Sequence, residues 1–183
     1  MSNFEPRKVE LNTGEIVEIS PINMNDWDAF EKQNRQFASE TTHTYQTLEL
    51  PLNKEKLMSK WNPPKKGDSD FIFKVMDSKG DMLSCFGVHF AMKHHPWVKH
   101  VAIFGMGILK SHWGTGLAVQ IMKTMEDVAR DEGATRLEAL VRVANDRGVA
   151  FYKKMGFEIE GTRRKAALIN GEYQDEYFIA KML

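Results

Sequence analysis

The segment WGTGLA, residues 113–118, could bind a phosphate group through its backbone. It lies between an apolar run, residues 101–109, and a stretch whose apolar side chains recur at helical spacing. Free N–H groups at the start of a helix lie at the positive end of its dipole, and glycine lets an anion approach the backbone closely. Gly114 and Gly116 equally suit a turn that needs glycine only for its dihedral angles. The segment alone therefore leaves two interpretations open, an anion site and a turn.

Two well-known phosphate-binding patterns do not fit this segment. The dinucleotide pattern GxGxxG needs a third glycine where Val119 stands. The P-loop needs a Gly-Lys-Ser/Thr run, and none follows here. An anion site at this position would therefore take a different phosphate-bearing ligand.

A second pair of chemical groups is Asn145 and Tyr152, the first at the end of an expected strand and the second on the helix that follows. Their spacing of seven residues is two helical turns, so both lie near one face. The amide can bind a ligand, and the phenol can donate a hydrogen bond or a proton. Alternatively, Asn145 serves only as a helix N-cap and Tyr152 as a core aromatic residue.

The elements that would position these groups follow from the spacing of the apolar residues. Strands are expected over residues 9–11, 16–19, 71–77, 82–92, 100–109, 136–143, 157–168 and 172–182. Helices are expected after an N-cap at Asn25 or Asp26, from Asn53 to before Pro63, from Leu117 to Gly133, and from Asn145 to Met155. One strand–helix–strand unit thus lies in an otherwise antiparallel sheet, which predicts a mixed α/β fold rather than a fully alternating one.

Length and composition restrict the possible partners and location. The 183 residues predict a single domain over 1–183, and 25 basic against 25 acidic residues give no net charge. Nucleic acid and membrane partners are therefore not expected. The single Cys85 fits a reducing compartment, and the best apolar run is far shorter than the roughly 20 residues of a membrane span. Because the N-terminus also lacks the apolar core of a signal peptide, we expect a cytoplasmic protein.

Together, the two segments resemble the GNAT superfamily of N-acetyltransferases, over nearly the full chain from Val9 onward. WGTGLA is similar to that family's acetyl-CoA motif, Gln/Arg-x-x-Gly-x-Gly/Ala. Gly116 and Ala118 stand in the last two fixed places, and Trp113 is a departure in the first.

The family's second signature and its closing hairpin are also matched. Asn145 is followed by a helix that ends in Tyr-x-x-x-Gly-Phe, here Tyr152, Gly156 and Phe157. The tail, residues 160–183, resembles the closing hairpin of the branch that includes ribosomal-protein and small-amine acetyltransferases. The resemblance further implies that the chain can form a homodimer, with this hairpin as its surface.

The resemblance implies the GNAT fold, with helices on both faces of a mostly antiparallel central sheet. This sheet splays between its fourth and fifth strands, when the two short N-terminal strands are counted as one. These two strands are residues 100–109 and 136–143. The resemblance also implies acetyl-CoA as the cosubstrate, with its pantetheine arm paired along residues 100–109. Gly105 and Gly107 are unusual in a central strand and fit a bulge or a close approach of the ligand. The implied cofactor-binding residues are Met106, Gly107, Ile108, Leu109, Trp113, Gly114, Thr115, Gly116, Leu117, Ala118, Asn145 and Tyr152.

The implied reaction is transfer of an acetyl group to a primary amine by direct attack in a ternary complex. A backbone N–H near Ile108 would polarise the thioester carbonyl. Tyr152 would be the catalytic residue, as the family's usual proton donor to the thiolate. The amine is either a small molecule or a protein N-terminus, and the motifs do not distinguish the two.

The group that deprotonates the amine is not identified by the sequence. Relatives often carry a glutamate on the strand before the pyrophosphate loop, where this chain has apolar residues and Ile103 near the expected place. Glu138, Glu40, His43 or a chain of waters are the substitutes, and none is assigned. His94, His95 and His100 lack paired cysteine or carboxylate ligands, so no metal is expected.

Two other classes of function compete with the enzyme. The missing strand carboxylate supports a non-catalytic module that binds acyl-CoA as a sensor, whereas Tyr152 favours turnover. An unrelated nucleotide-binding domain is disfavoured because both phosphate-loop patterns are absent.

Overall fold

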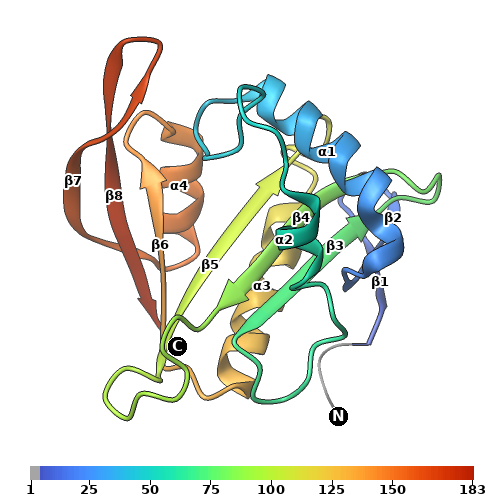
Figure 1. Ribbon diagram of the computed structural model, residues 1–183, viewed down its shortest axis with the longest axis horizontal. Helices are drawn as coiled ribbons and strands as arrows, with labels where there is room; N and C mark the ends of the chain where they lie inside the picture. Colours follow the sequence, from blue (N-terminus) through green and yellow to red (C-terminus); the bar gives the residue numbers. More distant parts are fainter. Residues whose placement is uncertain (1–4) are drawn as a thin grey trace.

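The computed structural model describes residues 5–183, and its strands form one eight-stranded sheet in the order β1-β2-β3-β4-β5-β6-β8-β7 (Figure 1). The strands are β1 (Arg7–Glu10), β2 (Ile16–Pro21), β3 (Asp70–Met76), β4 (Met82–His89), β5 (Val101–Ile108), β6 (Arg136–Arg142), β7 (Glu158–Ile169) and β8 (Glu172–Met182). The helices are α1 (Trp27–Glu40), α2 (Lys54–Met58), α3 (Leu117–Asp131) and α4 (Asp146–Lys154). The expected order of elements is therefore confirmed.

The sheet is antiparallel except where β5 meets β6, and that parallel contact is short. Only Val101, Ala102 and Ile103 pair with β6, opposite Arg136, Leu137 and Glu138. Beyond these three pairs β5 stays bonded to β4 and β6 stays bonded to β8. The sheet therefore opens between β5 and β6, which confirms the expected splay (Figure 1).

Helices α3 and α4 pack on one face of this sheet. The apolar residues of α3 recur at helical spacing, and Leu117, Ile121, Met125 and Val128 are fully buried. They pack in one cluster with Phe71 and the alternate residues of β3 and β4 that point to the same side. Burial of this apolar stripe fixes α3 beneath β4 and β5, so that its first residue lies where β5 ends.

Helices α1 and α2 cover the opposite face, as the fold class predicts (Figure 1). Trp27 and Phe30 of α1 pack with Trp61, whose ring lies 5.9 Å and 5.0 Å from theirs. Ile72 and Cys85 of the sheet complete this second cluster. None of the helices between residues 5 and 183 combines the length and apolar composition that crossing a membrane requires.

Two expected elements are shorter than the sequence suggests. Helix α2 begins after its N-cap Asn53 but ends at Met58, because Trp61 leaves the helical path to become buried between Trp27 and Phe30. Strand β4 ends at His89 rather than residue 92, and the N–H of the next residue, Phe90, bonds to the carbonyl of Ser69.

Candidate functional site

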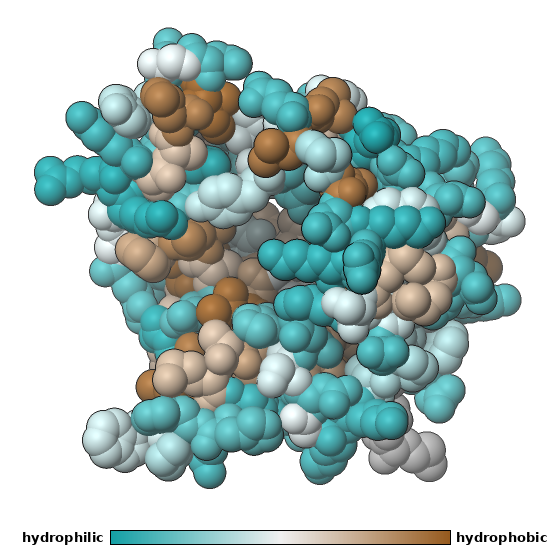
Figure 2. Space-filling model, viewed as in Figure 1, coloured by the Kyte–Doolittle hydropathy of each residue, from teal (hydrophilic) through white to brown (hydrophobic). Residues whose placement is uncertain are grey.

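The opening between β5 and β6 is a cavity of about 900 Å³. Its walls come from β5, β6, the start of α3, one side of α4 and the loop after α1. Figure 2 shows the surface hollowed near the middle of this face, with apolar residues around the hollow. The cavity therefore lies where the two expected site segments converge.

The glycine segment turns the chain from β5 into α3 at one end of this cavity. Gly114 and Gly116 have φ angles of +80° and +88°, which favour glycine. A Cβ on Gly116 would also lie 3.1 Å from the side chain of Asn12, and the Asn12 N–H bonds to the carbonyl of Thr115. Both glycines and Ala118 line the cavity. The glycines are thus required by the dihedral angles of the turn, and the same turn presents the start of a helix to the cavity, where the anion site stays a prediction.

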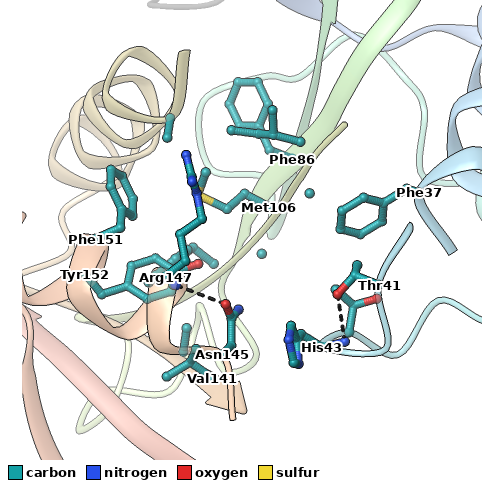
Figure 3. A pocket seen from close by; sticks show the side chains of 18 of the residues that line it. Phe37, Thr41, His43, Phe86, Met106, Val141, Asn145, Arg147, Phe151 and Tyr152 are labelled. Carbon is teal, nitrogen blue, oxygen red and sulfur yellow. Dashed lines mark hydrogen bonds between the residues drawn. The ribbon is translucent and has the colours of Figure 1, made fainter. Parts of the chain in front are cut away.

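Trp113 and Arg147 meet above this turn. The Trp113 indole N–H donates a hydrogen bond of 2.9 Å to the carbonyl of Ile108, and its ring lies 4.8 Å from the guanidinium carbon of Arg147. A Cβ on Gly114 would lie 3.9 Å from Nη2 of Arg147. Arg147 also extends into the cavity near Met106 (Figure 3). A cation thus lies beside the helix start, where an anion would bind.

Sequence reasoning missed Arg147, although a signal was present. A positive side chain in the first turn of a helix opposes the helix dipole, so its placement there indicates a role other than helix stability. Lys154, on the last turn of α4, also lines the cavity.

Two backbone N–H groups of β5 face the opening without a partner among residues 5–183. The Leu109 N–H bonds to the carbonyl of Leu83 on β4. Backbone groups alternate in direction along a strand, so the N–H groups of Met106 and Ile108 point the other way, toward β6. Strand β6 does not pair there. An extended ligand could therefore bond to β5 as an additional strand does.

The two glycines of β5 differ in their surroundings, and the close approach of a ligand stays a prediction for both. The register between β4 and β5 runs without a shift, so the bulge interpretation is wrong. A Cβ on Gly107 would lie 2.6 Å from the ring of Phe37, whereas a Cβ on Gly105 would meet nothing within 4 Å. Gly107 accommodates an aromatic ring, and Gly105 leaves open space in the cavity wall.

Tyr152 belongs both to the core and to the cavity wall. Its ring packs against Phe104, Phe151 and Phe157, with centroids 5.5 Å, 5.4 Å and 5.8 Å away. The residue also lines the cavity (Figure 3). Burial raises the pKa of its phenol to about 12. The phenol therefore remains protonated at neutral pH and can donate a hydrogen bond.

Asn145 caps α4 and lines the same cavity. Its Oδ1 accepts a hydrogen bond of 3.0 Å from the Gly148 N–H (Figure 3). A Cβ on Gly148 would lie only 2.5 Å from Nδ2 of Asn145, so the glycine makes room for the cap. Asn145 is therefore an N-cap, and its amide also lies on the cavity wall, where ligand binding stays a prediction.

Nine of the twelve expected cofactor-binding residues line the cavity. They are Met106, Gly107, Ile108, Trp113, Gly114, Gly116, Ala118, Asn145 and Tyr152. The side chains of Leu109, Thr115 and Leu117 are instead buried beside it in the protein. That these three residues contact a cofactor stays a prediction, and the contact would have to be made by their backbone atoms.

Of the three side chains considered as a base, one lies at the cavity. Glu138 binds Arg136 at 2.8 Å, at the end where β5 and β6 are paired. Glu40 accepts the backbone N–H of Lys110 at 2.7 Å. His43 lines the cavity, opposite Asn145 (Figure 3). Within the described residues, no three histidine, cysteine or carboxylate side chains are grouped so as to hold a metal ion.

Three further polar residues line the cavity and have no place in the expected site. They are Tyr45, on the loop after α1, Arg142 at the end of β6, and Glu176 on β8. The Tyr45 hydroxyl donates to Glu176 at 2.8 Å, and Arg142 lies 2.8 Å from the same carboxylate.

Comparison with known proteins identifies similar sequences and folds. The sequence pattern of the acetyltransferase (GNAT) family matches residues 28–157. The L-amino acid N-acetyltransferase AaaT of Escherichia coli is 40% identical over 93 residues, which are 50% of this chain and 57% of that protein. The uncharacterized N-acetyltransferase YdgE of Bacillus subtilis is 28% identical over 54% of this chain and 61% of its own length. The chain thus matches a little over half the length of these relatives.

Solved structures share the fold at low sequence identity. A GNAT-family acetyltransferase from Streptococcus pneumoniae superposes with a TM-score of 0.80 at 22% identity, covering 91% of this chain and 99% of that one. The putative acetyltransferase yncA from Salmonella typhimurium, solved with its cofactor acetyl-CoA, gives 0.76 at 12% identity over 91% and 94%. The matched pattern extends from α1 to the end of α4 and includes both site segments. The chain belongs to the acetyltransferase (GNAT) family.

Proposed function

We propose that this chain is an acetyl-CoA-dependent N-acetyltransferase that moves an acetyl group to a primary amine. The observation that carries the proposal is the opening between β5 and β6, where unpaired backbone groups of β5 and the Tyr152 phenol line one cavity. A structural neighbour with the same fold was solved with acetyl-CoA as its cofactor. The single domain over 1–183, the cytoplasmic location, the homodimer and the ribosomal-protein branch stay predictions of the sequence.

The cofactor would bind along the cavity in two parts. Its pyrophosphate would lie at the start of α3, against Gly114 and Gly116, with Arg147 as the nearest cation. Its pantetheine arm would bond to the groups of Met106 and Ile108 that face the opening. This placement would bring the thioester between β5 and Tyr152.

The acetyl group would then move in one displacement. The amine nitrogen attacks the thioester carbon, the N–C bond forms, the C–S bond breaks and the pair of electrons leaves on sulfur. A backbone N–H of β5 near Ile108 that the pantetheine arm leaves free would stabilise the oxygen that becomes negative. The proton that the amine loses balances the one that the thiolate gains, so the products are the acetylated amine and free coenzyme A.

The raised pKa of Tyr152 restricts its role in this step. An ordinary thiol has a pKa of about 8.5, so complete proton transfer from a phenol of pKa about 12 would be uphill by roughly 5 kcal/mol. We therefore assign Tyr152 the role of hydrogen-bond donor to the developing thiolate. The proton that finally reaches sulfur would come from the amine.

The acceptor is a primary amine, either a small molecule or a protein N-terminus. The relative AaaT is named an L-amino acid N-acetyltransferase, which favours a small acceptor. His43 is the one considered base that lines the cavity, so we propose it as the residue nearest the incoming ammonium group.

Calorimetric titration with acetyl-CoA, with ATP and NAD as controls, tests the cofactor. Selective binding of acetyl-CoA, followed by release of free thiol when amines are added, is the expected result. Binding without turnover of any amine would instead support an acyl-CoA sensor, the alternative favoured by the apolar residue Ile103 on β5. Failure to bind acetyl-CoA would overturn both assignments.

A further inference from the structure

Three charged residues form a row across the last three strands of the sheet, beside the cavity. In the strand register Arg142 of β6 lies opposite Glu176 of β8, and Glu176 lies opposite Arg163 of β7. Residues opposite one another in a sheet point to the same face. Glu176 lies 2.8 Å from Nη1 of Arg142 and 3.3 Å from Nη1 of Arg163. One carboxylate thus stands between two guanidinium groups, and the row keeps one positive charge in excess.

Glu176 is held in place by this row and by the loop after α1. Its side chain is 3% exposed, and both of its oxygens lie within 2.9 Å of the Tyr45 hydroxyl. The Tyr45 ring also lies 5.0 Å from the guanidinium carbon of Arg142. With a phenol and two guanidinium groups around it, Glu176 acts as the counter-ion that fixes Arg142 rather than as a free base.

Arg142 has N–H donors that no acceptor among the described residues satisfies. Its side chain is 3% exposed, yet its Nε–H has no hydrogen-bond acceptor among residues 5–183. Its Nη1 approaches Glu176 as an ion pair but without the alignment of a hydrogen bond. Buried N–H groups of a charged side chain are costly when left without an acceptor. Because Arg142 also lines the cavity, a bound molecule can supply the missing acceptor.

We infer that Arg142 binds a carboxylate of the acceptor, so that the acceptor is an amine that also carries a carboxylate, as an α-amino acid does. The inference rests on the proposed acetyltransferase function. Guanidinium groups and carboxylates match in charge and in the direction of their hydrogen bonds, and one carboxylate balances the single excess charge of the row. Arg142 would thus be the residue that determines acceptor specificity.

The surroundings of Arg142 also fit an amino acid with an apolar side chain. Leu140 lies two residues earlier on β6, on the same face, and is 37% exposed. Ile103 of β5, 38% exposed, lines the same cavity. These two apolar surfaces stay partly exposed among residues 5–183. They make leucine, methionine and phenylalanine suitable probes.

Binding to the unmodified protein tests the inference directly. L-leucine, L-methionine and L-phenylalanine are titrated into the protein, free and saturated with coenzyme A, alongside their three primary amides. At least one acid should bind ten times or more tighter than its amide. Equal affinity for acid and amide, or no binding of any acid, would overturn the inference. Acetylation of amides as fast as acids would do so too, while leaving the acetyltransferase function intact.

One double variant localises the effect to Arg142. The double variant R142Q/E176Q removes the buried charges together. E176Q alone would leave the buried Arg142 without its counter-ion, and R142Q alone would leave the buried Glu176 with only Arg163 as its cation. It should lose the preference for acid over amide by at least tenfold while keeping its affinity for acetyl-CoA within twofold. Retained preference, or a parallel loss of acetyl-CoA affinity, would place the carboxylate elsewhere.

Arg163→Gln is the matched control for the double variant R142Q/E176Q. Arg163 contacts the same carboxylate, but its side chain is 48% exposed and does not line the cavity. This variant should retain the preference for acid over amide. A loss equal to that of R142Q/E176Q would show that the excess charge of the row, and not the Arg142 donors, sets the preference.

Discussion

The ring of Phe37 on α1 fills the space that a side chain at position 107 of β5 would occupy. A Cβ on Gly107 would lie 2.6 Å from Cε1 and 2.7 Å from Cζ of that ring. Both residues line the cavity, so this contact sets how closely α1 approaches β5 beside the proposed pantetheine path.

Gly107→Ala should therefore destabilise the protein by about 1–3 kcal/mol, the usual cost of overpacking. Gly105→Ala, on the same strand with open space around its Cβ, is the control and should change the free energy of unfolding little. Adding Phe37→Leu to Gly107→Ala should recover part of the loss. Urea denaturation of the four proteins measures this, and equal effects at positions 105 and 107 would contradict the steric explanation.

Tyr152→Phe should lower kcat by roughly a hundredfold while the Kd for acetyl-CoA stays within about twofold, because the phenol hydrogen bond forms only as charge develops on sulfur. Steady-state kinetics and calorimetry measure the two quantities separately. If kcat is unchanged, Tyr152 is a structural residue and the thiolate is stabilised from elsewhere.

The same phenol predicts a difference in stability at alkaline pH. Its pKa is about 12 in the folded protein, above the ordinary value of 10.0, because burial disfavours the phenolate. The contribution of the buried, protonated phenol to the free energy of unfolding is fully present below pH 10. It is lost as the pH rises toward 12, because the phenol of the unfolded chain ionises first. The native protein should therefore lose about 1.3 kcal/mol more than Tyr152→Phe between pH 9 and 11. Parallel stability curves would contradict the burial of the hydroxyl.

Gly116→Glu should abolish measurable binding of acetyl-CoA, because it places bulk and negative charge at the proposed pyrophosphate position. Gly116 has a positive φ, so part of the cost is backbone strain. Gly133→Glu is the matched control, since Gly133 also has a positive φ but open space around its Cβ and lies outside the cavity. Only the variant at position 116 should lose affinity; if both do, strain explains the result.

Arg147→Gln should weaken acetyl-CoA binding about tenfold, the cost of losing one hydrogen bond to a charged group. Lys153→Gln removes a positive charge from the same helix at a residue that does not line the cavity, and should leave the affinity nearly unchanged. Raising the salt concentration should reduce the difference in acetyl-CoA affinity between Arg147→Gln and Lys153→Gln. Equal losses would mean that the overall charge of α4, rather than Arg147, attracts the cofactor.

Much of the fold could be predicted because most elements bury one apolar face, and the spacing of that face is local in the sequence. Helix α3 and the alternation in β3 are clear examples. The end of α2 could not be predicted, since it depends on Trp61 packing against α1.

The candidate site likewise contains features that are local in the sequence and features that depend on the whole fold. The glycine turn and the Asn145 cap are local features, so single-sequence reasoning found them. The row of Arg142, Glu176 and Arg163 depends on the register among three strands, which no short stretch of sequence specifies. Tyr45 bonds to Glu176 of this row from an irregular loop. In such a loop neither the spacing of apolar residues nor a sequence motif indicates a functional residue.

The three-pair contact between β5 and β6 also bears on the solubility of the empty protein. Strand edges without partners are where the sheets of separate molecules join and aggregate. Past Ile103, two such edges face each other inside one chain. A ligand laid along β5 would cap one of them, and at a hundred times its Kd would add about 2.7 kcal/mol to the free energy of unfolding. Bound cofactor would thus reduce aggregation of this chain, in addition to its proposed role as cosubstrate.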